Sequence, residues 1–319
     1  MKIIFFGSSK FSVPFLESIY YSNHEICAVV TNIDKIAGRG KKLLPNPVKV
    51  KAAELNLNFF EIEKFNNHIF KILSDLNFDC IVVVSFGHII PKDIIDLSND
   101  KIINVHPSLL PKYRGPSPIE STLLNGDTET GISIIKINEA LDAGDILIQS
   151  KFKISLDDNK DLLEKKMIQI GCNLLIGILN LLKDNYIEAF PQKGKATYCK
   201  MFSKEDYKIN WNLSASKIKN KIRAFSSEPG AFTFFNNQRI KILKAIEYNY
   251  QDENIKNFII SKDFKAGSII NADKEKGLLI KCGDEKVLQI LELQVEGKNK
   301  INFNDFLNGY KPSIGDYFL

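Results

Sequence analysis

The chain has 319 residues, of which 44% are hydrophobic and 25% are charged. This composition excludes an intrinsically disordered protein, and the length allows two hydrophobic cores. The net charge of +5 is too small to indicate nucleic-acid binding by itself. The five cysteines stand singly without a CxxC pair, which argues against a disulfide framework and against a zinc site. No apolar run has the length of a membrane span, so we expect a cytoplasmic protein.

The first part of the chain alternates short apolar runs with helical patterns, which predicts a Rossmann-like α/β domain with a mostly parallel sheet. The run CIVVV at residues 80–84 is continuous and β-branched, as expected for a strand that is covered on both faces. The predicted strands are residues 3–6, 26–30, 80–84, 101–105, 131–137 and 146–154, and the predicted helices are residues 11–21, a stretch from residue 91, and residues 162–182.

After residue 182 the pattern changes. Residues 183–204 contain Pro191 and Gly194 and show no sustained period, which indicates a linker. A predicted helix at residues 215–225 is followed by short strands at residues 231–235, 238–248, 267–271, 277–282 and 286–295, a pattern typical of a small antiparallel, OB-like β-barrel. We therefore predict a catalytic domain at residues 1–185, a linker at residues 186–205 and a barrel domain at residues 206–319.

Three polar residues stand where this fold would place a ligand. Asn104 and His106 lie at the C-terminal end of a predicted buried strand, where open α/β sheets bind their ligands. Residues two apart on a strand point to the same face, so both side chains can reach one substrate atom. Asp142 follows in the string LDAGD. An amide, an imidazole and a carboxylate can together stabilise an oxyanion and move a proton. Taken singly, each is more often a cap or a turn former, so the hypothesis depends on the whole string.

The string NVHPSLLPKYRG, followed by LDAGD, resembles the hallmark of the 10-formyltetrahydrofolate-dependent formyltransferase superfamily. The resemblance places Asn104, His106 and Asp142 on the catalytic Asn, His and Asp of the family. It also implies that two loops bind the folate co-substrate. The residues that it assigns to folate binding are Phe86, Gly87, Ile89, Ser108, Leu109, Leu110 and Pro111.

The resemblance implies direct transfer of a formyl group from 10-formyltetrahydrofolate to an amine, without a metal and without a covalent intermediate. In that mechanism Asn104 and a protonated His106 donate hydrogen bonds to the developing oxyanion. Asp142 orients His106, raises its proton affinity, and accepts through a water the proton that the amine loses.

The loop at residues 32–45 bears on which amine accepts the formyl group. Five cations and no carboxylate lie between Arg39 and Lys51, a pattern that by itself usually marks a solvated surface. However, the string DKIAGRGKKL resembles the insertion with which methionyl-tRNA formyltransferases contact the acceptor arm. This resemblance implies initiator methionyl-tRNA as the partner. The residues that it assigns to tRNA binding are Arg39, Lys41, Lys42, Leu43 and Arg114.

The C-terminal part carries most of the net charge. Residues 203–319 contain 19 Lys and Arg against 15 Asp and Glu, so they hold four of the five net positive charges. Small antiparallel barrels often bind RNA. Strings such as INW at residues 209–211 and IRAF at residues 222–225 resemble the C-terminal domain of the same enzymes. We see no obligatory protein partner and expect a monomer.

Three other hypotheses remain open. Sugar-nucleotide amine formyltransferases share the catalytic string, but the basic loop argues against that acceptor. The first strand opens a helix as in nicotinamide-dependent dehydrogenases, although GSSKFS lacks the G-x-G-x-x-G pattern. A non-catalytic RNA-binding protein would not need Asn104, His106 and Asp142 together.

Overall fold

The computed structural model describes residues 1–37, 42–184, 186–226, 228–248 and 263–319. Within this part, the chain forms two compact units. The N-terminal unit comprises Met1–Pro118, Glu129–Lys153 and Glu164–Met201, and the C-terminal unit comprises Ile119–Thr128, Ile154–Leu163 and Phe202–Leu319.

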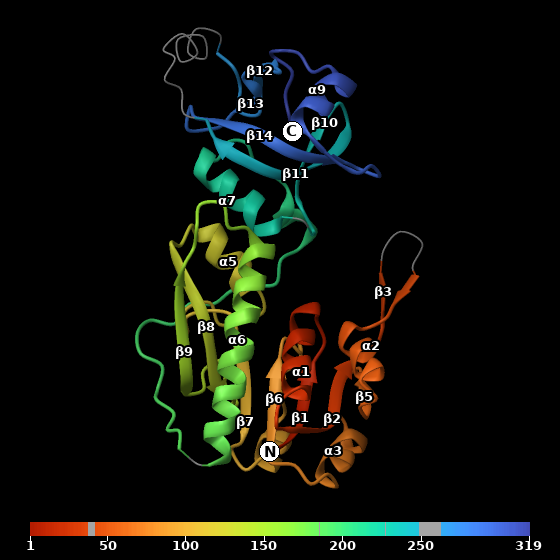
Figure 1. Ribbon diagram of the computed structural model, residues 1–319. Coiled ribbons are helices and arrows are strands. Elements are labelled where there is room, and N and C mark those ends of the chain that lie inside the picture. The colour runs from red at the N-terminus through yellow and green to blue at the C-terminus, as the bar shows by residue number, and fades with distance from the viewer. Residues whose placement is uncertain (38–41, 185, 227, 249–262) are drawn as a thin grey trace. The chain divides into compact units, whose positions relative to one another are not determined.

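A seven-stranded sheet forms the centre of the N-terminal unit, with the spatial order β5-β2-β1-β6-β7-β8-β9 (Figure 1). The pairs among β5, β2, β1, β6 and β7 are parallel, whereas β8 is antiparallel to both β7 and β9. The prediction of an α/β fold with a mostly parallel sheet is therefore confirmed. The strands are β1 (Lys2–Gly7), β2 (Glu25–Asn32), β5 (Phe59–Ile62), β6 (Cys80–Val84), β7 (Ile102–His106), β8 (Glu129–Lys136) and β9 (Ile146–Lys153).

The burial of each strand follows its position in the sheet. All five residues of β6 are buried, because a central parallel strand is covered on both faces. The edge strand β9 instead alternates half-buried and exposed side chains from Ile148 to Lys153. One face of β9 therefore meets water, as is common for antiparallel strands.

Helices cover both faces of this sheet (Figure 1). On one face, a Cβ atom added to Gly171 of α6 would collide with Phe15 of α1 and Ile132 of β8, so these three elements pack closely. On the other face, Ile69 of α3 and Ile94 of α4 share a core with side chains of β1, β2 and β6. None of the described helices is both long and apolar enough to cross a membrane. The helices are α1 (Val13–Tyr20), α2 (Pro47–Glu54), α3 (Asn67–Ser74), α4 (Lys92–Leu97) and α6 (Lys160–Lys183), and a 3-10 turn, η1 (Lys10–Ser12), precedes α1.

A β-hairpin and the helix α2 lie between β2 and β5, where no element was predicted. β3 (Lys35–Ala37) and β4 (Lys42–Leu44) form the antiparallel hairpin. Asn46 then caps α2, because its side chain accepts a hydrogen bond from the backbone N–H of Val48 at 2.9 Å. The helix buries only Val48 and Ala52, so it has little apolar periodicity by which it could be predicted.

The C-terminal unit contains a six-stranded antiparallel sheet with the order β10-β11-β14-β13-β12, and β15 pairs with β14. Trp211 lies in its core and donates a hydrogen bond from Nε1 to Thr233 Oγ1 at 3.0 Å. The antiparallel strands predicted for this part are therefore confirmed. The strands are β10 (Ala231–Phe235), β11 (Gln238–Glu247), β12 (Ile269–Asp273), β13 (Gly277–Lys281), β14 (Val287–Val295) and β15 (Lys300–Asn302). The remaining helices within the described residues are α5 (Pro118–Asn125), η2 (Lys204–Tyr207), α7 (Ala215–Phe225) and α9 (Phe303–Tyr310).

The residues that follow α9 connect the two edges of this sheet, at β10 and beside β12. The backbone N–H of Phe318 donates to the carbonyl of Gly267, next to β12, and the N–H of Leu319 donates to the carbonyl of Phe234 in β10, each at 2.9 Å. Phe318 is only 2% exposed. The closure expected of a barrel is thus made by an irregular segment rather than by a strand.

Candidate active site

Asn104 and His106 lie at the C-terminal end of β7. Val83 of β6 pairs with Asn104, and Ser133 of β8 pairs with His106, so both residues are held between neighbouring strands. Because they are two residues apart, their side chains point to the same face. Asn104 is half-buried and His106 is 4% exposed, so this edge of the sheet excludes most water.

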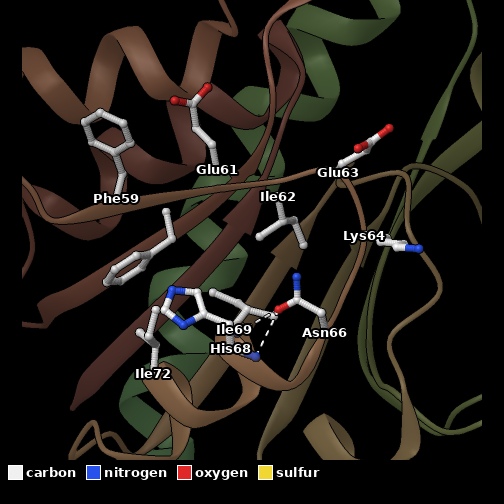
Figure 2. Close-up of a pocket in the computed structure, with 10 residues that line it drawn as sticks. Phe59, Glu61, Ile62, Glu63, Lys64, Asn66, His68, Ile69 and Ile72 are labelled. Atoms are coloured by element: carbon white, nitrogen blue, oxygen red, sulfur yellow. Dashed lines mark hydrogen bonds between the residues drawn. The ribbon is translucent and has the colours of Figure 1, made fainter.

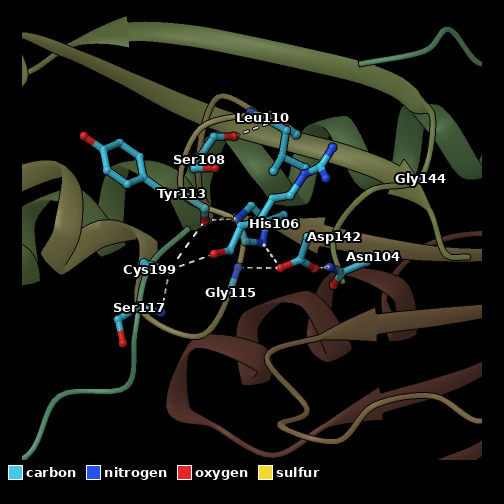
Figure 3. A network of polar contacts seen from close by, with 12 residues as sticks. Asn104, His106, Ser108, Leu110, Tyr113, Gly115, Ser117, Asp142, Gly144 and Cys199 are labelled. Carbon is cyan, nitrogen blue, oxygen red and sulfur yellow. Dashed lines mark hydrogen bonds and ion pairs between the residues drawn. The ribbon is translucent and has the colours of Figure 1, made fainter. Parts of the chain in front are cut away.

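The carboxylate of Asp142 joins the two side chains of β7 (Figure 3). Its Oδ1 accepts a hydrogen bond from Asn104 Nδ2 at 3.2 Å, and its Oδ2 accepts one from the backbone N–H of Gly115 at 2.8 Å. Nδ1 of His106 lies 3.6 Å from the same Oδ2. Asp142 has a φ of +47°, a left-handed conformation that Asp tolerates in turns. The amide, the imidazole and the carboxylate therefore meet in one place.

The surroundings of His106 favour its neutral form. Burial lowers the pKa of His106, and this outweighs the raising effects of Asp142 and of the hydrogen bond to Tyr113. Its Nε2 lies 2.9 Å from the carbonyl oxygen of Tyr113. A carbonyl only accepts, so Nε2 carries a hydrogen, and in the neutral imidazole Nδ1 then carries a lone pair. Asp142 thus favours the protonated form of His106, as the resemblance implies, whereas burial favours the neutral form and has the larger effect.

The loop after β6 holds the first group of predicted folate residues. Phe86 is 1% exposed and packs with its ring centroid 5.1 Å from that of Phe6, so it supports the loop from within the core. Gly87 has a φ of +83°, which a side chain would disfavour. Ile89 is 82% exposed. Asn32, which was not predicted, donates from Nδ2 to the carbonyl of Phe86 at 3.0 Å and so fixes the start of the loop.

The loop after β7 holds the second group, and it leaves the same edge of the sheet because β6 and β7 are parallel neighbours. Ser108 is fully buried, and its hydroxyl donates to the carbonyl of Lys112 at 2.6 Å. Leu110 is also buried, whereas Leu109 and Pro111 are half-buried. Within this segment, Leu109 and Pro111 therefore keep part of their surface accessible, while the other two side chains shape the loop from beneath.

Two residues that were not predicted hold this loop on the antiparallel part of the sheet. The hydroxyl of Ser133 in β8 accepts from the backbone N–H of Leu110 at 3.2 Å and donates to the carbonyl of Ser108 at 2.6 Å. Gln149 of β9 donates to Ser133 Oγ at 2.8 Å and to the carbonyl of Leu110 at 3.1 Å. In the sequence, the one signal for this role is a serine inside an apolar run, and the structure shows that this serine is fully buried.

Arg114, predicted to contact tRNA, lies next to residues of the predicted linker. Its Nη2 donates to Gln192 Oε1 at 2.7 Å. Cys199 accepts a hydrogen bond from the backbone N–H of Ser117 at 3.3 Å. Gln192 and Cys199 were not predicted, because the stretch around them has no periodicity and contains the breakers that suggest a linker.

The β3–β4 hairpin carries the remaining predicted tRNA contacts. Arg39 and Lys41 lie outside the described residues, and the structure describes only the backbone of Lys42. Leu43 and Leu44 are 61% and 54% exposed. The hairpin therefore presents two neighbouring apolar side chains to solvent.

Two of the five cations between Arg39 and Lys51, namely Lys49 and Lys51, form ion pairs within the protein. Lys49 Nζ lies 2.8 Å from a carboxylate oxygen of Asp34 and 3.0 Å from one of Glu61. Lys51 forms ion pairs with two carboxylates in the same way. Asp34 also accepts from the backbone N–H of Asn46 at 2.9 Å. These lysines therefore belong to the base of the hairpin and to α2, which reduces the charge that the loop itself offers to RNA.

A separate pocket of about 340 Å³ lies between β5, the turn that follows it, and α3 (Figure 2). Asn66 in this pocket caps α3, because its Oδ1 accepts from the backbone N–H of His68 at 3.1 Å and of Ile69 at 3.0 Å. None of the lining residues belongs to the network of Figure 3. In the described part of the chain, no group of three or more His, Cys, Asp or Glu could hold a metal ion.

The fold and the three convergent side chains define a group-transfer enzyme of the α/β class. The Formyl transferase model matches residues 1–179, and the model of the formyl transferase C-terminal domain matches residues 201–311. The methionyl-tRNA formyltransferase of Dictyoglomus thermophilum is 42% identical over 322 residues, which cover 100% of both chains. That of Carboxydothermus hydrogenoformans is 40% identical over 100% of this chain and 99% of its own. The chain belongs to the methionyl-tRNA formyltransferase family.

Two solved structures with a similar fold are those of formyltransferases that act on sugars. WlaRD, a sugar 3N-formyl transferase crystallised with dTDP and 5-N-formyl-THF, has a TM-score of 0.66 at 23% identity, over 94% of this chain and 99% of its own. The N-formyltransferase of Helicobacter canadensis, in complex with folinic acid and dTDP-3-aminofucose, has a TM-score of 0.64 at 22% identity, over 91% of this chain and 99% of its own. At these identities the similarity shows the fold alone.

Proposed function

We propose that the protein transfers the formyl group of 10-formyltetrahydrofolate to the α-amino group of methionyl initiator tRNA. The products are N-formylmethionyl-tRNA, which serves translation initiation, and tetrahydrofolate. The observation that carries this proposal is the similarity to methionyl-tRNA formyltransferases over the whole chain, at 42% identity in one case. The sugar formyltransferases reach only 22% and 23% identity, so the amino-sugar acceptor is disfavoured.

Asn104 stabilises the oxyanion that forms when the amine attacks the formyl carbon. A primary amide has two N–H donors. One donor of Asn104 bonds to Asp142, and the second can reach the formyl oxygen. A donor placed in this way lowers the barrier by about 2.7–4 kcal/mol.

His106 accepts the proton that the attacking amine loses. Its Nδ1 holds a lone pair, and Asp142 Oδ2, 3.6 Å away, stabilises the imidazolium that results. As the new C–N bond to the methionyl amine forms, the bond between the formyl carbon and N10 of the folate breaks. The imidazolium then gives its proton to N10, so the histidine returns to its neutral state without a metal or a covalent enzyme intermediate.

The folate lies against the loops that follow β6 and β7. Ile89, Leu109 and Pro111 offer accessible apolar surface for its ring system. Gly87 lets the ligand approach the backbone closely, since it has no side chain. The buried residues of these loops, Phe86, Ser108 and Leu110, keep the loops in shape.

The tRNA acceptor arm contacts the β3–β4 hairpin and Arg114. The cations Arg39, Lys41 and Lys42 neutralise phosphates, while Leu43 packs against the end of the acceptor stem. Residues 1–185 form the catalytic domain, and residues 186–205 form a linker in which residues 190–199 pack against that domain. Residues 206–319, with four of the five net positive charges, bind the rest of the tRNA. The protein acts as a monomer in the cytoplasm, where initiator tRNA is charged.

One assay tests this function. Purified protein and 10-formyltetrahydrofolate are offered either methionyl initiator tRNA or a dTDP-linked amino sugar, and formylated product is quantified. We expect formylation of the tRNA at a kcat/KM at least 100-fold above that for the amino sugar. Formylation of the amino sugar alone, or a formyl adduct on the protein itself detected by mass spectrometry, would overturn the proposal.

A further inference from the structure

Residues 190–199 lie against both catalytic loops of the N-terminal unit. Phe190 exchanges two backbone hydrogen bonds with Ile146, at 2.8 and 3.0 Å, directly after the Asp142 loop. Thr197 accepts at its carbonyl from the N–H of Arg114 at 2.9 Å and donates to the carbonyl of Pro111 at 3.1 Å. This segment, called the strap here, is therefore attached to the loop after β7 and to the loop before β9.

Between these two attachments, one side chain connects the loops to each other. Gln192 Nε2 donates to the carbonyl of Asp142 at 2.8 Å and to the carbonyl of Gly144 at 2.9 Å. Gln192 Oε1 accepts from Arg114 Nη2 at 2.7 Å and from Arg114 Nε at 3.2 Å. Both donors and both acceptor positions of the amide are therefore used.

These contacts complete a ring of hydrogen bonds around the catalytic carboxylate. Gln192 holds the backbone of Asp142, the Asp142 carboxylate accepts from the N–H of Gly115, and the neighbouring Arg114 returns to Gln192. Gly144 in the Asp142 loop lies directly against the backbone of β8, because a Cβ atom at this position would overlap the carbonyl oxygen of Lys136. A displacement of Gln192 would therefore change the hydrogen bonds of both Arg114 and the Asp142 backbone.

We infer that Gln192 is a positioning residue that couples the side chain of Arg114 to the placement of the Asp142 carboxylate beside His106. When the acceptor end of the substrate engages Arg114, Gln192 keeps the catalytic loop in its working geometry. This inference rests on the proposed function, in which Arg114 contacts the acceptor arm and Asp142 acts on His106.

Two variants distinguish the contact of Gln192 with Arg114 from its contact with the Asp142 backbone. Gln192→Met keeps the size of the side chain and removes every hydrogen bond, so we expect kcat to fall about 10- to 100-fold and KM for methionyl-tRNA to rise. Gln192→Glu keeps an acceptor for Arg114 but sets an oxygen against two carbonyls, so we expect kcat to fall with KM almost unchanged. Gln169→Met, at an exposed position on α6, is the matched control and should retain wild-type kinetics.

The pH profile distinguishes positioning from a structural role. Asp142 is the charged group that acts on the imidazole of His106, and it raises the pKa of His106. If Gln192→Met lets this carboxylate move away, the acid limb of kcat/KM moves to lower pH. Partial unfolding would lower kcat without moving the acid limb of kcat/KM. The pH profile therefore distinguishes the two explanations even if Gln192→Met has a lower Tm than the wild type.

The result that would overturn the role of Gln192 differs from the result that would overturn the proposed function. Failure of the wild-type protein to formylate methionyl-tRNA would overturn the proposed function. A wild-type protein that formylates, together with a Gln192→Met variant whose kcat stays within twofold or whose acid limb does not move, would overturn the role of Gln192 alone.

Discussion

The catalytic edge of the sheet and the β3–β4 hairpin differ in how they hold their functional side chains. At the edge, both oxygens of Asp142 have partners and His106 is 4% exposed. In the hairpin, Leu43 is 61% exposed. Chemistry requires groups that are oriented before the substrate arrives, whereas the recognition of a large polyanion requires groups that stand in solvent. Substitutions in the two regions should therefore separate kcat from KM.

The largest effect is expected from Asp142→Asn. The variant keeps the shape of the side chain but removes the charge that stabilises the His106 imidazolium, so kcat/KM should fall by about 10²- to 10⁴-fold. Formylation of methionyl-tRNA is measured at saturating 10-formyltetrahydrofolate. Asp145→Asn, which alters an exposed carboxylate of the same loop, is the control. Activity within threefold of the wild type would contradict the assignment of Asp142.

Asn104→Ala should come next. Loss of one oxyanion donor lowers kcat by about 10²- to 10³-fold, because the donor acts on charge that develops only in the transition state. KM for methionyl-tRNA should stay close to the wild-type value. Steady-state kinetics with varied tRNA separate the two constants, and a change confined to KM would show that Asn104 binds substrate rather than stabilising the oxyanion.

In the hairpin, the double variant Leu43→Ala with Leu44→Ala should raise KM for methionyl-tRNA by about tenfold, which corresponds to about 1.4 kcal/mol of lost apolar contact. The value of kcat should be unchanged, since neither side chain reaches the catalytic edge. Leu156→Ala, at another position where leucine is 80% exposed, is the matched control. An equal increase in KM for the control would contradict a specific contact.

Salt dependence sharpens the distinction between cations that bind RNA and cations that support the hairpin. Lys42→Met should reduce the slope of log binding constant against log salt by about 0.7–0.9, the release expected for one phosphate contact. Lys49→Met should leave the slope unchanged, because Lys49 is paired with Asp34 and Glu61. Filter binding at several salt concentrations measures both slopes, and equal changes in the two variants would refute the distinction.

The smallest effect concerns pH. Burial lowers the pKa of His106, so the neutral form that acts as a base persists below the ordinary histidine pKa of about 6.5. The acid limb of kcat/KM should lie below that pH. The same shift makes the stability contribution of neutral His106 complete above about pH 6.5 and lost as the pH falls toward the folded-state pKa. A loss of activity as the pH rises through the histidine range, instead of as it falls, would show that His106 acts in its protonated form.

The sequence predicted those parts of the molecule that depend on local patterns. The apolar run at residues 80–84 is β6 without any shift, and the spacing of Asn104 and His106 on β7 gave their common face. Gln192 could not be found in this way, because its partner Arg114 is 78 residues away in the chain and only the fold brings them together. The lowered pKa of His106 was missed for a related reason, since its cause, burial, is a property of the packed structure.

The segment that closes the C-terminal sheet has a consequence for how the protein is made. Phe318 and Leu319 are synthesised after every strand that they connect, so this sheet stays open at one side until translation has passed them. The N-terminal unit ends at Met201 and can complete its own core earlier, while the ribosome is still adding later residues. Ribosome-bound chains that stop before residue 318 should therefore display a folded catalytic part beside an incompletely closed barrel.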